Sequence, residues 1–277
     1  MTTWQRFRQH KAAMTGLIIL IIMVIMATIG PHLTPYTYYD VNLIHKNLPP
    51  SITYWFGTDD LGRDLFTRVW YGARISLFVG SAAATIDVII GVLWGSIAAL
   101  AGNKTDEFMM RFADILYALP YLLVVIMLIV AMGSGIIPII IAMTVIGWIN
   151  MARIVRSEVL RLKRQEFILA AQALGASFWR LLLRHLIPNT AGSIIVTLTL
   201  TIPSAIFVEA FLSFLGLGVQ APIASWGTMA REGLPALQYY PWRLFFPAIF
   251  ISLTMLGFNL IGDGLHDALD PKSTQKA

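Results

Sequence analysis

Between two long apolar runs of this sequence lies the stretch Glu166-Phe167-Ile168-Leu169-Ala170-Ala171-Gln172-Ala173-Leu174-Gly175, inside a polar segment that covers residues 153–189. The segment is too polar to cross a bilayer, yet it is not low in complexity and contains no proline before Pro188. Residues 166–174 are rich in strong helix formers, and Gly175 is placed to end the helix as a C′ glycine does. A second helix is predicted over residues 178–187, ending at Pro188. The sequence therefore predicts a compact pair of short helices between the two apolar runs.

The apolar runs on either side of this segment, and those further out, have the length of membrane spans. A helix needs roughly 20 apolar residues to cross a hydrocarbon core of about 30 Å. Six candidates meet this requirement, at residues 15–33, 75–101, 115–132, 136–152, 191–212 and 244–262. The third and fourth are separated only by Met132-Gly133-Ser134-Gly135, which predicts a tight turn and an antiparallel hairpin. We therefore expect an all-α membrane protein with six transmembrane helices.

The composition agrees with this class. Hydrophobic residues make up 57% of the 277 residues and charged residues only 13%, whereas a soluble domain carries about 25% charged residues. The chain has no cysteine, so disulfides and thiolate metal sites are excluded. The first apolar run follows basic residues as a signal peptide does, but no small-x-small cleavage site follows it, and we expect a retained helix.

Lysine and arginine are distributed unevenly between the two sides of the expected membrane. Most of the 20 Lys and Arg residues fall on the side that holds both termini and the 153–189 segment: Arg6, Arg8, Lys11, Lys104, Arg111, Arg153, Arg156, Arg161, Lys163, Arg164, Arg180, Arg184, Lys272 and Lys276. The remainder are Lys46, Arg63, Arg68, Arg74, Arg231 and Arg243. The positive-inside rule places the more basic side in the cytoplasm. The expected topology is therefore N-in and C-in.

Two interpretations of the short helix pair are open from composition alone. Small side chains at Ala170, Ala171 and Ala173 would let another backbone approach closely, which suits insertion into a groove of a partner. An amphipathic helix pair that rests on the bilayer, with Arg and Lys near lipid headgroups, explains the same composition.

A resemblance to a known family decides between them. Leu169-Ala170-Ala171 followed by Gly175, and then Leu186-Ile187-Pro188-Asn189, is similar to the EAA loop of ABC-importer permeases. In that family the loop is the coupling helix that docks on the ATPase subunit. One departure is present: Leu169 stands where the family has the acidic residue that names the motif, which affects a polar contact by that residue and not the docking itself. The resemblance implies that coupling to the ATPase involves Glu166, Leu169, Ala170, Ala171, Leu174 and Gly175.

Further motifs over residues 55–271 resemble the dipeptide, oligopeptide and nickel permeases of the same family. They are FGTDDLGRD at 56–64, GAR at 72–74, EAFLSFLGLG at 209–218, SWGTM at 225–229, NLIGDGL at 259–265 and DALDP at 267–271. Their order, and the long outer segment after the first helix, resemble the C-type subunit of the permease pair.

The resemblance also implies the architecture. The expected fold is that of a type I ABC importer permease. Residues 1–74 are expected to form the cytoplasmic tail, the first helix and an outer segment. Residues 75–277 are expected to form the core permease domain, with the coupling loop at 153–189.

The implied function is the permease subunit of an ATP-driven importer of di- or oligopeptides in the bacterial inner membrane, with a nickel or metal-chelate importer as the alternative. The expected partners are a second, B-type permease, one or two ABC ATPase subunits, an extracytoplasmic substrate-binding protein and the lipid bilayer, with no nucleic acid. The chain is expected to bind no metal or cofactor itself. ATP and Mg²⁺ are expected on the ATPase subunits, since the sequence holds no GxxxxGK[ST] motif.

Two rival classes explain less of the sequence. A secondary transporter usually shows inverted repeats or broken, charged helices at the midplane, and no internal repeat is evident. An intramembrane enzyme would need a histidine within a span near a serine such as Ser134, but the five histidines fall at or beyond span ends. We therefore do not expect an enzyme.

Two acidic residues fall within predicted spans. Asp87 lies about 18 Å along its helix from Ile75, a depth at which an unpaired carboxylate costs several kcal/mol. It is a candidate for the wall of a polar translocation path, while an interhelical hydrogen bond or a neutral buried acid is the favoured alternative. Glu209 lies near the outer end of the fifth span, where it could line an outer gate, face the binding protein, or pair with Arg231 or Arg243.

Overall fold

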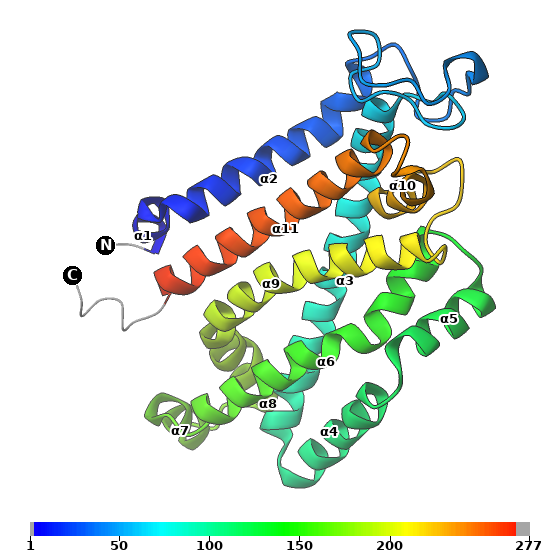
Figure 1. Cartoon of the computed structure of the whole chain (residues 1–277). Coiled ribbons are helices and arrows are strands. Elements are labelled where there is room, and N and C mark those ends of the chain that lie inside the picture. Colours follow the sequence, from blue (N-terminus) through cyan, green and yellow to red (C-terminus); the bar gives the residue numbers. More distant parts are fainter. Residues whose placement is uncertain (1–2, 270–277) are drawn as a thin grey trace.

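The computed structural model describes residues 3–269, and its regular secondary structure is helical apart from one β-bridge between Thr58 and Asp64 (Figure 1). The helix α3 (Leu65–Ala101) runs the length of the molecule, and α6 (Ile136–Leu162) and α9 (Ile187–Phe214) pack along it. A second pair, α2 (Lys11–Ile29) and α11 (Trp242–Leu269), packs on α9 through α11. The shorter elements are α1 (Thr3–Gln9), η1 (Gly30–His32), η2 (Leu43–His45), α4 (Asn103–Tyr117), α5 (Tyr121–Met132), α7 (Glu166–Ala173), α8 (Phe178–Arg180), η3 (Leu181–Leu186), α10 (Trp226–Gly233) and η4 (Leu234–Ala236).

Close approach of the helices depends on glycine. On α3, Gly91 and Gly95 are spaced as in a GxxxG motif, and both face α6. A Cβ atom on Gly91 would lie 2.6 Å from Cβ of Met151, and one on Gly95 would collide with the carbonyl oxygen of Ala152. Small residues at such a seam let two membrane helices pack backbone against backbone. This seam joins the pair of helices that carries the central part of the fold.

Within residues 3–269, five helices are long and apolar enough to cross a membrane: Lys11–His32, Leu65–Ala101, Ile136–Leu162, Phe178–Phe214 and Trp242–Leu269. They correspond to five of the six predicted spans, and each helix is longer than the predicted span.

The predicted continuous span over residues 115–132 is wrong. In its place α4 and α5 meet at an angle of 82°. Pro120 explains the break, because it has no N–H to donate and because it disfavours a helical conformation of Leu119. The two helices also differ in character: α4 carries Asp106 and Asp114, whereas α5 is apolar throughout. The structure has a sixth span only if this bent pair is counted as one.

The predicted helix end at Pro188 is also wrong. The π-helical turn η3 leads directly into α9, so that residues Phe178–Phe214 form one helix of 37 residues. In this turn the N–H of Ile187 donates to the carbonyl of Leu182. A π-turn is wider than an α-turn, and it accommodates a proline that cannot donate to the preceding turn.

The two ends of the described chain lie close together. Nε2 of His10 lies 3.4 Å from the carboxylate of Asp267, and α1 packs on α11. Figure 1 shows that α7 and α8 lie toward the same end of the molecule, and that the segment between η1 and α3 lies at the opposite end with α10. This arrangement matches the expected N-in, C-in topology. Lys272 and Lys276, and the last two residues of the DALDP motif, lie outside the described residues.

Candidate coupling and translocation sites

The predicted pair of short helices forms a knob, defined here as residues 163–186, between α6 and α9. Ile168 on α7 is fully buried and packs in one apolar cluster with Leu162, Leu182 and Leu186. This cluster fixes α7 against the end of the 37-residue helix. A movement of the knob would therefore be passed to that helix.

The predicted coupling residues lie on the outer side of the knob. Glu166, Leu169, Ala170, Leu174 and Gly175 are exposed, and Ala171 is half-buried. The side chain of Leu174 is the extreme case, with 89% of its surface exposed, and Leu169 is 51% exposed.

Three further apolar side chains are exposed on the knob. They are Phe167, Trp179 and Leu183, which the sequence analysis did not single out. The sequence alone could have indicated these three residues as contact residues, because large apolar side chains within a polar, helical segment need a partner surface to cover them. Exposed apolar side chains gathered on one structural unit indicate an interaction site.

Gly175 ends α7 as predicted. Its φ of +79° lies in the left-handed region, which favours glycine. The N–H of Gly175 donates to the carbonyl of Gln172 at 2.9 Å, and that of Ala176 donates to Ala171 at 3.0 Å. No atom lies within 4 Å of the position that a Cβ on Gly175 would take. A side chain there would project outward from the knob.

Asp87 lines a cavity of about 630 Å³ between α3, α5, α6 and α9. The residue is only 6% exposed, and its Oδ1 has no hydrogen-bond partner among residues 3–269. The expected interhelical hydrogen bond is therefore not found for this atom. The cavity is lined by Asp87, Tyr121, Met143, Gly147, Asn150, Met151, Arg153, Ile154, Thr197, Leu200, Thr201, Ser204, Ala205 and Val208.

Glu209 lies elsewhere, fully buried near the outer end of α9. Oε1 of its carboxyl group accepts a hydrogen bond from Oγ of Ser213 at 2.8 Å, and the hydroxyl groups of Ser76 and Ser225 lie nearby. Oε2 has no hydrogen-bond partner among residues 3–269. Neither Arg231 nor Arg243 is among its partners, so of the alternatives that the sequence left open, pairing with one of these arginines is not found.

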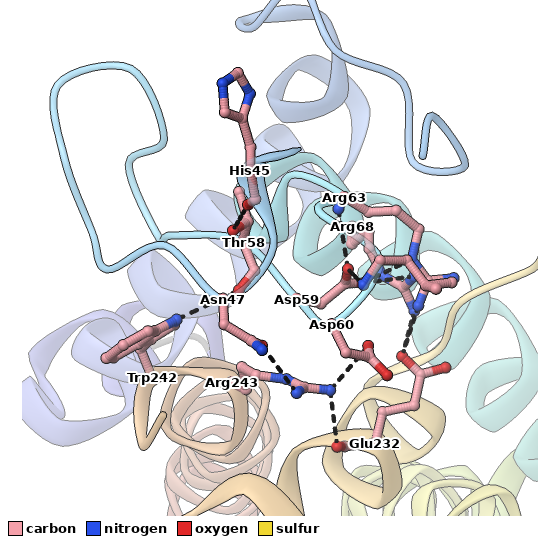
Figure 2. A network of polar contacts seen from close by, with 11 residues as sticks. His45, Asn47, Thr58, Asp59, Asp60, Arg63, Arg68, Glu232, Trp242 and Arg243 are labelled. Atoms are coloured by element: carbon pink, nitrogen blue, oxygen red, sulfur yellow. Dashed lines mark hydrogen bonds and ion pairs between the residues drawn. The ribbon is translucent and has the colours of Figure 1, made fainter. Parts of the chain in front are cut away.

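A network of ion pairs holds the outer segment, defined as residues 33–64 between η1 and α3, on the helices, as Figure 2 shows. Arg63 lies 2.6 Å from the carboxylate of Asp59 and 3.1 Å from that of Glu232 on α10. Arg68 on α3 contacts the same two carboxylates, at 3.1 Å and 2.8 Å. Arg63, Arg68 and Asp59 are buried. Buried charges are tolerated when each has a well-placed partner, and here two cations share two anions.

Arg243 extends the network to α11. Its guanidinium donates to Asp60 at 3.0 Å, to Asn47 at 3.1 Å and to the backbone carbonyl of Glu232 at 3.1 Å. Asp64 caps α3 by accepting from the N–H of Thr67 at 2.8 Å. The segment from Asp59 to Asp64 is therefore a structured turn that leads into the start of α3.

Residues 91–275 match the family described as binding-protein-dependent transport system inner membrane component. The chain belongs to this family. Residues 2–50 match a second family, the N-terminal transmembrane domain of oligopeptide transport permease C. As a member of the inner membrane component family, the chain is a multi-pass permease subunit and not an enzyme.

Curated relatives are similar over nearly the whole chain. An oligopeptide transport system permease protein OppC of Bacillus subtilis (strain 168) is 63% identical, covering 96% of this chain and 88% of the relative. A dipeptide transport system permease protein DppC of the same organism is 58% identical, covering 97% and 84%. The expected resemblance to C-type permeases is confirmed.

A solved structure shares the fold at low sequence identity. The chain is similar to the MetNI methionine ABC transporter in inward-facing conformations, with a TM-score of 0.60 and 16% identity, over 72% of this chain and 94% of the other. This confirms the expected ABC permease fold.

Proposed function

We propose that the chain is the C-type permease subunit of an ATP-driven importer of di- and oligopeptides, and that it forms the translocation path with a second permease. The proposal is supported by identities of 63% and 58% to an oligopeptide and a dipeptide permease. Because those identities extend over nearly the whole chain, they include both the knob and the outer segment.

The knob is proposed to dock on an ABC ATPase subunit. Glu166, Leu169, Ala170, Ala171, Leu174 and Gly175 form the coupling contacts, and the exposed Leu174 inserts into a groove of the ATPase. The observation that carries this step is the exposure of large apolar side chains on a unit that is continuous with a membrane-spanning helix. Closure of the ATPases would then move the knob and α9 together, and rigid-body motion of this kind switches a path between two openings.

The remaining partners follow from this assignment. ATP and Mg²⁺ bind to the ATPase subunits. At the opposite end, the outer segment and α10 receive substrate from an extracytoplasmic binding protein. Their ion-pair network suits this role, because it holds several segments in one rigid surface. The complex lies in the bacterial inner membrane.

The translocation path is proposed to run along the cavity that Asp87 lines. Its walls come from α3, α5, α6 and α9, and the second permease closes the open side. Glu209 is proposed to act near the outer gate through its packing against the region of Ser76 and Ser225, and not by contacting substrate, because it is fully buried.

Affinity purification of the tagged chain from gently solubilised native membranes tests the proposal, with mass spectrometry of the proteins that accompany it. We expect a second permease and one or two ATPases with Walker A motifs. The complex, reconstituted in proteoliposomes with its binding protein, is then assayed for ATP-dependent uptake of tripeptides and of Ni²⁺. Recovery of the chain alone, or only as a homo-oligomer, would contradict the partner assignment; uptake of Ni²⁺ without peptide would contradict the substrate.

A further inference from the structure

Asp87 is a buried carboxylate without a cationic partner. It lies in the C-terminal half of α3 and is 6% exposed. It appears in none of the ion pairs among residues 3–269. Its space is provided by Gly147 on α6, since a Cβ there would collide with Oδ2 of Asp87. The fold thus keeps a carboxylate inside the membrane and leaves one of its oxygens without a hydrogen bond.

The facing wall of the cavity presents hydrogen-bond acceptors. On α9 the hydroxyl group of Thr197 donates to the carbonyl of Ser193 at 2.8 Å, and that of Thr201 donates to Thr197 at 2.8 Å. The hydroxyl of Ser204 donates to the carbonyl of Leu200 at 3.0 Å. A hydroxyl has a single proton and two lone pairs. With each proton donated to the backbone, the three oxygens offer only lone pairs to the cavity.

The one basic side chain that lines the cavity is already paired. Arg153 lies on α6 about 9 Å along the helix from Gly147. Its guanidinium lies 2.8 Å from the carboxylate of Asp114 and 4.4 Å from the centre of the Tyr117 ring. The other titratable group at the cavity is Tyr121 on α5, whose ring face would attract a cation. The section of the cavity around Asp87 therefore combines a carboxyl group, acceptor oxygens, the amide of Asn150 and an aromatic ring.

We propose that Asp87, with the hydroxyl oxygens of Thr197, Thr201 and Ser204, forms a binding site for a cationic group of the solute in transit. This inference rests on the proposed function, and the group that fits best is the terminal ammonium of a peptide. An ammonium has three donors and no acceptor, which complements the three hydroxyl oxygens of α9 beside a carboxyl group; the amide of Asn150, which also lines the cavity, can add its oxygen as an acceptor. A bound metal cation shares the positive charge, and the experiment below separates the two sources.

The absence of cysteine from the chain allows a direct test. Ser204→Cys places the only thiol of the chain in the cavity. In the complete importer, its rates of reaction with cationic 2-aminoethyl methanethiosulfonate and anionic 2-sulfonatoethyl methanethiosulfonate are compared. The control is Ser157→Cys, an exposed position on the same helix as Gly147, about 15 Å further along it and beyond the roughly 8–10 Å range of unscreened charge. Because Arg153 and Arg161 lie one turn from position 157 on either side, the ratio at position 204 is also compared with and without Asp87→Asn.

We expect the cation-to-anion rate ratio at position 204 to exceed the ratio at position 157 by at least tenfold. Asp87→Asn in the Ser204→Cys background should remove most of that excess, and Asp87→Glu should retain it. Equal ratios at the two positions with Asp87 intact would overturn the proposal, and this comparison needs no variant of Asp87. A thiol at position 204 that neither reagent reaches would overturn it as well.

Protection of the same thiol identifies the cation. Trialanine, delivered by the binding protein with ATP, should slow modification at position 204, and the slowing should be lost with Asp87→Asn. Protection by NiCl₂ and not by trialanine would contradict the peptide importer but keep the cation site. Protection by neither solute would overturn the site, even where the uptake assay supports peptide import.

Discussion

The guanidinium of Arg68 on α3 lies 2.8 Å from the carboxylate of Glu232 on α10, although 164 residues separate the two in the chain. Arg68 is almost fully buried, whereas the side chain of Glu232 is 35% exposed. The pair therefore joins the start of the central helix to the outer surface of the molecule. Since Glu232 also contacts Arg63, its removal would affect two buried or nearly buried cations.

Glu232→Gln should lower the stability of the purified complex by about 1.5–3 kcal/mol, the range for a hydrogen bond to a charged group. Asp59 still contacts both arginines, which limits the loss. Thermal unfolding in detergent measures the effect. Glu158→Gln is the matched control, because Glu158 pairs with the exposed Arg161 at the surface, and such a pair contributes about 0–1 kcal/mol. Equal effects of the two substitutions would contradict the role of the network.

Gly95→Ala should destabilise the chain by about 1–3 kcal/mol, because an added methyl group in a tightly packed seam forces the helices apart. The methyl group would meet the backbone of Ala152 and of Arg156, which cannot move aside as a flexible side chain can. The control is Gly192→Ala on α9, where the nearest atom is 4.0 Å away. There the change should be neutral or stabilising by up to about 1 kcal/mol, from helix propensity alone. Thermal unfolding of the two variants gives the comparison.

Gly175→Glu should abolish ATP-coupled uptake while the subunit remains inserted and assembled with the second permease. The new side chain would project from the knob into the proposed ATPase interface. Gly175→Ala is the matched control, because it introduces the same left-handed strain, about 1–2 kcal/mol, without the charge or the bulk. We expect the alanine variant to retain most uptake. Normal uptake by the glutamate variant would disprove the coupling assignment, and equal loss in both variants would attribute the effect to strain.

Asp64→Asn should change how stability depends on pH. Burial raises the pKa of Asp64 above its ordinary value, an effect that hydrogen bonds from Thr67 partly offset. The folded state therefore binds this proton more tightly than the unfolded state, and stability rises as pH falls from the raised pKa toward the ordinary value of about 3.9. Asparagine also caps helices well, so the variant should keep the cap and gain stability relative to aspartate near neutral pH.

This gain should shrink as the pH of the unfolding experiment is lowered through that window. The same substitution at the exposed Asp40 serves as the control. A difference between Asp64→Asn and the unsubstituted chain that is constant with pH would contradict the prediction.

The two prolines at helix boundaries show what the sequence can and cannot predict. Hydropathy located the spans correctly where they were continuous, but it joined residues on both sides of Pro120 into one span. It also ended a helix at Pro188 that in fact continues. Both sites contain a proline after apolar residues, and the outcomes differ because a π-turn precedes Pro188 and none precedes Pro120. Whether neighbouring turns can rearrange around a proline is a property of the packed structure.

Some features of the candidate sites could likewise be predicted from the sequence, and others could not. The motif around Ala170 and Gly175 was recognisable from spacing, and Gly175 has the backbone conformation that the motif requires. The depth of Asp87 was also predictable, but its cavity was not, because the walls come from four helices. Glu209 illustrates the limit most clearly: the sequence left an outer gate, the binding protein and an arginine partner open, whereas in the fold its carboxyl group is fully buried and accepts a hydrogen bond from Ser213.

The unbroken helix from Phe178 to Phe214 has a mechanical consequence. At 1.5 Å per residue it is about 55 Å long, with about 37 Å between Phe178 and Pro203 and about 16 Å beyond. Pro203 is buried at this point of the helix, so the packing around it would act as the pivot for a tilt of the whole helix as one rod. A tilt about that point would displace the outer tip in the opposite direction to the knob, by less than half the distance. A displacement of several ångströms at the knob would then produce a smaller displacement, in the opposite direction, at the outer end of the helix. The same tilt would widen one opening of the translocation path and narrow the other.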